Sequence, residues 1–250
     1  MLLTSELIVR SNMRRFYLTA DQLRSCTVDD EEFRHMSVLR MGVGDRFIGL
    51  SDNSTADNVY ELTDISKKSA TFKFVEQIEN HANPKLNIVV FQALAKGDKL
   101  ETVTQKATEL GASGICPLYL KNCDVKEGSG KVNRLDKIAI SATKQCGRSL
   151  VPKILDTINI KGLENTLSDF DLIILANERE DKLPLIDVLN QNKSAKSIAI
   201  IVGPEGGFTD EEIEKIVSLG GKSVTLGTRI LRTETAGLYM LSVINEVLDN

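Results

Sequence analysis

Residues 197–238, SIAIIVGPEGGFTDEEIEKIVSLGGKSVTLGTRILRTETAGL, constrain the fold more than any other part of the chain. Residues 197–202 form a short β-branched run, which is typical of a strand buried on both faces of a parallel sheet. Three glycines among residues 203–207 then permit backbone conformations that side chains forbid. A second predicted strand, 223–226, leads into the polar loop 227–236. Because ligands of open α/β sheets bind beyond the carboxyl ends of the strands, the two loops predict one pocket.

The rest of the chain divides into two parts. Up to about residue 80, short strand-like runs separated by turn residues accompany one helix near 29–42, which predicts a small β-barrel. The polar, proline-containing segment 79–85 is typical of a linker. Beyond it, strands alternate with helices, which predicts a parallel sheet covered on both faces. The predicted domains are therefore 1–80 and 86–250. The strands are expected at 46–50, 59–65, 70–78, 87–95, 114–120, 172–176, 197–202 and 223–226.

Composition limits the class of protein. The longest apolar runs, such as 172–176, are far below the roughly 20 residues that a membrane span needs. The first residues lack the layout of a signal peptide, so the protein is expected to be soluble and cytoplasmic. Its four cysteines form no CxxC pair and it has only two histidines, so we expect neither a metal site nor a disulfide scaffold.

The charge is unevenly distributed. The formal net charge is −4, yet residues 96–153 contain eleven Lys or Arg against six Asp or Glu. A basic segment of this kind is either a solvated face or a surface for nucleic acid. Arginines near the start of the chain, Arg10, Arg14 and Arg15, and Arg40 near the helix end allow the same two readings.

The glycine loop 203–207 lacks the patterns of phosphate-binding loops. Neither GxGxxG nor GxxxxGK[ST] occurs there, and Glu205 in its middle would repel a phosphate. We therefore expect a ligand that is neutral or cationic at this end and is contacted by backbone groups. Thr209 and Glu212 form a capping box for the following helix, which gives them a structural role.

The loop 227–236 carries the most unusual cluster of side chains. Arg229, Arg232 and Glu234 precede a final apolar helix, 236–248. Thr233 or Thr235 is expected to cap this helix, and the structural alternative for Arg232 and Glu234 is an ion pair at the helix end worth under about 1 kcal/mol. Beside a glycine-lined pocket, this cluster is nevertheless the best candidate for a functional site.

Six motifs, in chain order, resemble those of the RsmE family. They are HMSVLRMGVGDRF (35–47), AKGDKLETVTQKATELG (95–111), KQCGRSLVP (144–152), NER (177–179), IVGPEGGFTDEEIE (201–214) and LGTRILRTETA (226–236). Members of this family methylate N3 of a uridine in small-subunit ribosomal RNA. The resemblance covers nearly the whole chain.

The resemblance implies a PUA-like β-barrel followed by a SPOUT-type parallel sheet with a C-terminal trefoil knot, working as a homodimer. The order of strands and helices alone predicts an ordinary doubly wound sheet, because chains almost never thread their own loops. The implied cofactor is S-adenosyl-L-methionine, bound by three knot loops. The residues implied to bind it are Leu175, Ala176, Asn177, Val202, Gly203, Pro204, Glu205, Gly207, Leu226, Gly227, Ile230, Leu231, Thr235 and Ala236.

N3 of uridine carries a proton and is a poor nucleophile until that proton is removed. The implied chemistry therefore needs a base that accepts the proton or a cation that stabilises the negative charge. We expect Arg232 to stabilise the negative charge and orient the base, and Glu234 to accept a proton or hold Arg232. The partner is small-subunit ribosomal RNA or the assembled subunit. The residues expected to contact it are Arg10, Arg14, Arg15, Arg40, Lys96, Arg148 and Arg179, with Asn177 as a further candidate.

Two alternatives remain open from the sequence. The same fold and cofactor would serve an enzyme that methylates a ribose 2′-hydroxyl or another RNA base. The barrel and the basic segment alone would serve a non-catalytic protein that binds RNA or assists ribosome assembly.

Overall fold

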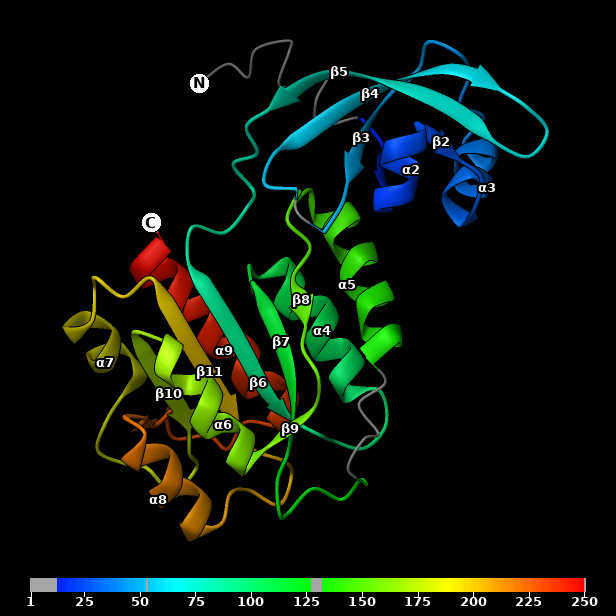
Figure 1. Ribbon diagram of the computed structural model, residues 1–250. Coiled ribbons are helices and arrows are strands. Elements are labelled where there is room, and N and C mark those ends of the chain that lie inside the picture. Colours follow the sequence, from blue (N-terminus) through cyan, green and yellow to red (C-terminus); the bar gives the residue numbers. More distant parts are fainter. Residues whose placement is uncertain (1–12, 53, 127–131, 250) are drawn as a thin grey trace. The chain divides into compact units, whose positions relative to one another are not determined.

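The computed structural model describes residues 13–52, 54–126 and 132–249 (Figure 1). The chain forms two compact units. Met1–Asn83 and Thr143–Val151 make up the first, while Pro84–Ala142 and Pro152–Asn250 make up the second. The predicted boundary near residue 80 thus lies close to that between the units, and the units differ from the predicted ranges in that Thr143–Val151 groups with the first. That segment joins the first unit through contacts far apart in sequence, which no local pattern reports.

The first unit is a curled sheet with two helices. Its elements are β1 (Arg15–Tyr17), α2 (Ala20–Ser25), β2 (Thr27–Val28), α3 (Glu31–Val38), β3 (Arg46–Leu50), β4 (Asp57–Ile65) and β5 (Ala70–Ile78). The strand order is β1-β3-β4-β5-β2, with β1 parallel to β3 and the other pairs antiparallel. Among the described residues β1 and β2 do not pair, so the expected barrel is open at this seam. Edge-to-face contacts of Phe47 with Phe16 and Phe72 fill its core.

The second unit contains the predicted parallel sheet. Its strands are β6 (Asn87–Ala93), β7 (Gly114–Tyr119), β8 (Lys153–Ile154), β9 (Ile158–Asn159), β10 (Leu172–Ala176), β11 (Ser197–Val202) and β12 (Lys222–Val224). They follow the order β12-β10-β11-β6-β7-β8, with β9 also paired to β7, and every recorded pair is parallel. The α/β class is therefore confirmed.

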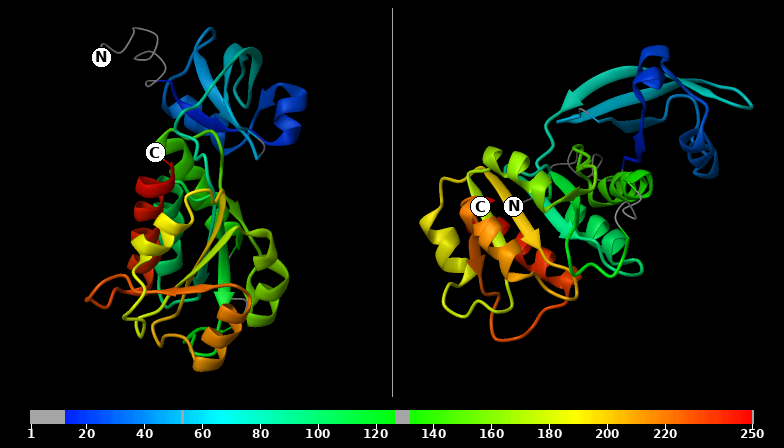
Figure 2. Two further views of the ribbon diagram at one scale, coloured as in Figure 1. Left: turned by 90° about the vertical axis from the view of Figure 1, so that its left-hand side faces the viewer. Right: turned by 60° about the horizontal axis from the view of Figure 1, so that its bottom comes forward.

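Helices cover both faces of this sheet (Figure 2). The helices of this unit are α4 (Lys99–Glu109), α5 (Val132–Cys146, which ends in the first unit), α6 (Ile160–Thr166), α7 (Leu185–Gln191), α8 (Asp210–Ser218) and α9 (Thr233–Ile244), with the 3₁₀ helix η1 (Leu167–Asp169) and the π-helix η2 (Asn245–Asp249). Alternate residues of β6 face opposite sides: Ile88 and Val90 pack with α4, α7 and α9, whereas Val89 and Phe91 pack with α6 and α8. Each face of the sheet therefore has its own hydrophobic core, because successive side chains along a strand point to opposite faces. None of the described helices is long and apolar enough to cross a membrane.

Candidate functional site

A cavity of about 500 Å³ lies at the carboxyl edge of the parallel sheet. Segments that follow β10, β11 and β12 surround it, and Lys99 at the start of α4 completes its lining. The two loops singled out in the sequence therefore share one cavity. This is the place at which open α/β sheets hold ligands.

The predicted cofactor residues line this cavity, with the exceptions of Leu175 and Thr235. Leu175 is completely buried in β10 and packs into the core, and Thr235 is exposed on α9. Cofactor binding by all of these residues stays a prediction. The structure adds to the lining Lys99, Glu178, Gly206, Phe208, Thr225, Thr228, Arg229, Arg232 and Thr233. All of these except Thr225 stand inside the motifs quoted above, and Arg229 and Arg232 belong to the cluster singled out in the loop 227–236.

The glycines of the loop 203–207 are required by close approaches. A Cβ atom on Gly203 would lie 2.8 Å from the ring of Phe208. Gly207 has a φ of +68°, and its Cβ would lie 2.5 Å from Oε1 of Glu178. The amide of Asn122 donates hydrogen bonds to the carbonyl oxygens of Gly206 (3.2 Å) and Gly207 (3.0 Å). The loop is therefore held in one shape that only glycine fits without strain.

Lys99 connects the two loops electrostatically. Its Nζ lies 2.8 Å from Oε1 of Glu205 and 3.7 Å from Oε2 of Glu234. Burial raises the pKa of Glu205, but hydrogen bonds from Lys99 and the backbone outweigh it, so this pKa lies below its ordinary value. The hydrogen bond to Glu205 also raises the pKa of Lys99. The sequence places Lys99 in the basic segment and in the motif 95–111 but not at the cavity, because a pair 106 positions apart leaves no local pattern.

The alternative of an Arg232–Glu234 ion pair is wrong. Arg232 lines the cavity and is exposed, and within the described residues no ion pair or hydrogen bond engages its guanidinium. Glu234 does not line the cavity; it is paired with Lys99 instead. Its Oε2 atom is buried and has no hydrogen-bond partner among the described residues. The guanidinium of Arg232 is therefore available to a ligand in the cavity, whereas Glu234 lies outside the cavity lining.

The expected cap of the last helix is also wrong. The N-cap of α9 is Arg232, which makes no side-chain capping bond. Thr233 is the first residue of the helix, and its hydroxyl donates to the carbonyl oxygen of Gly203 at 2.5 Å. That bond joins the two loops directly. By contrast, the capping box of Thr209 and Glu212 on α8 is confirmed.

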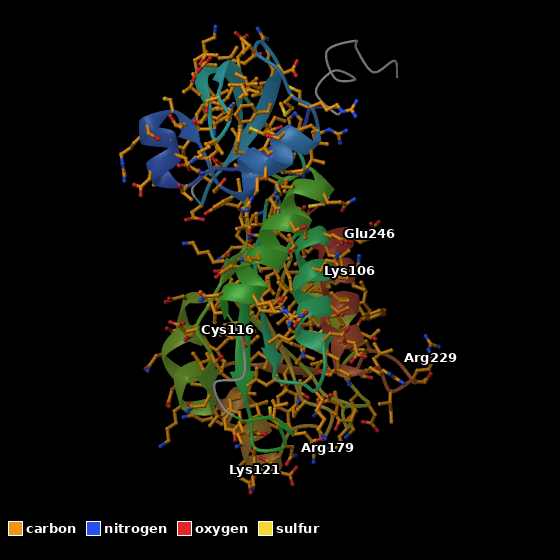
Figure 3. The ribbon with its side chains drawn as sticks, turned by 90° about the vertical axis from the view of Figure 1, so that its right-hand side faces the viewer. Lys106, Cys116, Lys121, Arg179, Arg229 and Glu246 are labelled. Atoms are coloured by element: carbon orange, nitrogen blue, oxygen red, sulfur yellow. The ribbon has the colours of Figure 1, made fainter. Side chains whose placement is uncertain are left out.

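Asn177 and Arg179 follow β10 at the same sheet edge. Asn177 lines the cavity, and its amide donates to Oγ of Ser223 at 3.1 Å. Arg179 is exposed, lies 2.5 Å from Oδ1 of Asp210 and donates to the carbonyl oxygen of Phe208 at 3.1 Å. Arg179 and Arg229 lie near this end of the second unit, with Arg229 pointing outward (Figure 3). A substrate contact by Arg179 would have to compete with Asp210.

The residues predicted to contact RNA differ in exposure. Arg14 and Arg40 are exposed, as is Lys96, which is paired with Asp124 at 2.8 Å. Arg15 is paired with Asp57, and its side chain is only 12% exposed. Arg148 is 2% exposed, and burial lowers its pKa to about 10. The structure therefore gives no support to direct phosphate contacts by these last two side chains, and Arg10 lies outside the described residues.

Comparisons with known proteins match both parts of the chain. A family model described as an RNA methyltransferase domain matches residues 81–245, and one described as an RNA methyltransferase PUA domain matches residues 28–75. The PUA-like character of the first unit is thus confirmed.

Curated proteins and a solved structure that resemble this chain are ribosomal RNA methyltransferases as well. Ribosomal RNA small subunit methyltransferase E of Bacillus subtilis (strain 168) is 33% identical over 247 residues, covering 93% of this chain and 96% of that protein. The protein of the same name from Mesomycoplasma hyopneumoniae (strain 232) is 31% identical over 233 residues, covering 92% and 98%. The crystal structure of that enzyme from Neisseria gonorrhoeae, bound to S-adenosyl methionine, is 30% identical with a TM-score of 0.80, covering 94% of this chain and 98% of the other.

Proposed function

We propose, from the premise that this chain belongs to the ribosomal RNA small subunit methyltransferase E family, that it methylates N3 of a uridine in small-subunit ribosomal RNA. Family membership makes it an S-adenosylmethionine-dependent methyltransferase of that RNA. The uridine and its N3 atom are the proposed part. The single observation that carries the proposal is the cavity at the sheet edge, lined by Arg232, whose guanidinium makes no ion pair or hydrogen bond within the described residues.

The residues of the cavity fit S-adenosylmethionine. Its loop 203–207 contributes five consecutive residues to the cavity lining, two of them glycines that a Cβ atom would crowd or strain, so backbone groups make up much of this wall. The carboxylate of Glu178 in the lining suits a cationic sulfonium. We assign cofactor binding to the predicted residues that line the cavity. When bound, the cofactor supplies an electrophilic methyl group.

Arg232 is the residue that we assign to the acceptor base. Loss of the N3 proton leaves negative charge on the uracil carbonyl oxygens, and a guanidinium beside them stabilises that charge. Arg232 meets two requirements of this role, because it lines the cavity and is not committed to a carboxylate. We assign Glu234 to holding Lys99 and not to accepting the proton, since its Oε2 atom is buried, is paired with Lys99 at 3.7 Å and belongs to a residue outside the cavity lining.

The finer architecture is also part of the proposal. We infer a SPOUT-type domain in which the segments after β10, β11 and β12 are the loops of a trefoil knot, and the convergence of these segments on one cavity supports it. We further propose a homodimer working in the cytoplasm, where its ribosomal substrate is made. Sedimentation equilibrium gives the mass of the assembly, and a monomer at micromolar concentration would contradict the dimer.

The test is methyl transfer from tritiated S-adenosylmethionine. We expect incorporation into small ribosomal subunits or naked small-subunit RNA, and mass analysis of the nucleosides should find N3-methyluridine. A methyl group on a ribose 2′-hydroxyl or another base would contradict the proposed position while keeping the enzyme class. No heat on titration with the cofactor would favour the non-catalytic alternative.

RNA affinity is expected to fall steeply with salt, because basic side chains displace counterions from phosphates. Each phosphate contact contributes about 0.7 to the slope of log affinity against log salt for single strands. Arg14→Ala, which removes an exposed arginine, should lower the slope by about that amount. Filter binding at several salt concentrations measures it.

Arg24→Ala is the matched control. Arg24 is also exposed, belongs to the same unit and is paired with Asp21. We expect its slope to equal that of the unaltered protein. A slope near zero for the unaltered protein, or equal losses in both variants, would contradict the predicted surface.

A further inference from the structure

Gln92 is the one polar residue among the buried residues of β6. It stands near the carboxyl end of β6, between Phe91 and Ala93, and is 1% exposed. Buried amides are expected to have hydrogen-bond partners. Its side chain does not line the cavity, although the strand ends beside it.

The partners of Gln92 lead to the cavity in two steps. Its Nε2 lies 2.8 Å from Oγ1 of Thr233, and that hydroxyl lies 2.5 Å from the carbonyl oxygen of Gly203. A threonine hydroxyl has one hydrogen, and a carbonyl oxygen only accepts, so the hydrogen goes to Gly203. Oγ1 must then accept from the amide nitrogen, which fixes the orientation of Gln92. We call this chain of three residues the Gln92 relay.

The relay determines the position of two cavity segments at once. Gly203 belongs to the loop after β11, Thr233 begins α9, and both line the cavity. On its other side Gly203 meets the ring of Phe208, which a Cβ atom would approach to 2.8 Å. The carbonyl group of Gly203 is therefore fixed by Thr233, and the hydroxyl of Thr233 is fixed by Gln92.

Stability alone does not account for a glutamine at this place. Its Oε1 is buried and has no hydrogen-bond partner among the described residues. Leaving a buried acceptor without a partner is unfavourable, whereas an apolar side chain of similar shape leaves none. Methionine has nearly the same length as glutamine and fills core space readily.

We propose that Gln92 is a positioning residue for the cofactor site, acting through Thr233 on the carbonyl group of Gly203. This inference rests on the proposed function, because it takes S-adenosylmethionine as the ligand of the cavity. It predicts that affinity for the cofactor and stability of the fold respond differently to changes in the relay.

Calorimetric titration with S-adenosylmethionine, beside thermal melts, tests the relay. Gln92→Met removes the hydrogen bond to Thr233 and a longer one, 3.3 Å, to the carbonyl oxygen of Ala93. Loss of the bond to Thr233 should weaken binding by about three- to tenfold, while the melting temperature stays the same or rises because no acceptor is then left buried without a partner at residue 92. Thr233→Val should weaken binding at least as much. The double variant should bind no more weakly than Thr233→Val alone, because both changes break the same chain. Thr233→Ser keeps the hydroxyl and should restore affinity to within about twofold.

Thr104→Val is the matched control. Thr104 is equally buried in α4, its hydroxyl donates to the carbonyl oxygen of Leu100 at 2.8 Å, and it does not line the cavity. We expect unchanged cofactor affinity for this variant. If Gln92→Met does not fold, the comparison of Thr233→Val with Thr233→Ser decides.

The outcomes separate the two proposals. If Gln92→Met melts at a lower temperature but binds the cofactor with unchanged affinity, Gln92 has a merely structural role and the relay is overturned. Equal affinities of Thr233→Val and Thr233→Ser would also overturn it. Absence of binding heat in the unaltered protein contradicts the cofactor assignment itself. The relay is supported only if the unaltered protein binds the cofactor and Gln92→Met and Thr233→Val bind it more weakly, as described above.

Discussion

Arg232→Ala is expected to reduce methyl transfer about 100- to 1,000-fold, the usual effect of removing one group that stabilises developing charge. Cofactor affinity should stay within about twofold, because Arg232 makes no ion pair within the described residues and its exposed side chain does not support the fold. Single-turnover methylation and calorimetry measure the two quantities separately. Full activity of the variant would contradict the assigned role.

The pH dependence of this variant distinguishes charge stabilisation from simple misfolding. With Arg232 absent, the N3 proton is lost less readily at neutral pH, so raising the pH should recover part of the rate. Arg232→Lys keeps a positive charge but loses the planar guanidinium group. Its rate of methyl transfer should lie between those of the unaltered protein and Arg232→Ala. Lys222→Ala removes an exposed cation outside the cavity lining and should behave like the unaltered protein.

The parallel sheet could be predicted because its strands have local signals. The bounds of β10 and β11 agree with the prediction, since both are apolar, β-branched runs ending in polar loops. The strands β1, β2, β8 and β9 were not predicted, because each has only two or three residues and depends on its neighbours. The helix α6 is also missing from the prediction, because its one buried side chain, Leu163, does not make a recognisable apolar stripe.

The site could be predicted only in its outline. Glycines after a strand indicate a ligand loop, and this placed Gly203 and Gly207 correctly at the cavity. The capping pattern failed at Thr233, because the carbonyl oxygen of Gly203, 30 positions away, takes the hydroxyl that a local rule assigns to the helix end. Lys99 and Gln92 act through partners at similar or greater distances in sequence. Their roles depend on the folded sheet and leave no spacing to recognise.

Asp57→Ala is expected to lower the free energy of unfolding of the first unit by about 3–5 kcal/mol, as loss of one partner of a buried ion pair does. Asp57 is 9% exposed and accepts from the guanidinium of Arg15 at 2.7 and 2.8 Å. It also accepts from Asn80 at 2.8 Å and from the hydroxyl of Ser149. All of these donors lose their acceptor together. Urea unfolding followed by hydrogen exchange measures the change and locates it in the chain.

The loss should be confined to one unit, because every partner of Asp57 named above belongs to the first. Amides in β3 to β5 and in Thr143–Val151 should exchange faster, while those of β6 and β11 keep their protection. Asp21→Ala is the control: it removes an exposed ion pair with Arg24 and should cost less than about 1 kcal/mol. Equal losses in the two variants would contradict the anchoring role of Asp57. Because every residue that lines the cavity belongs to the second unit, Asp57→Ala should leave the affinity for the cofactor unchanged.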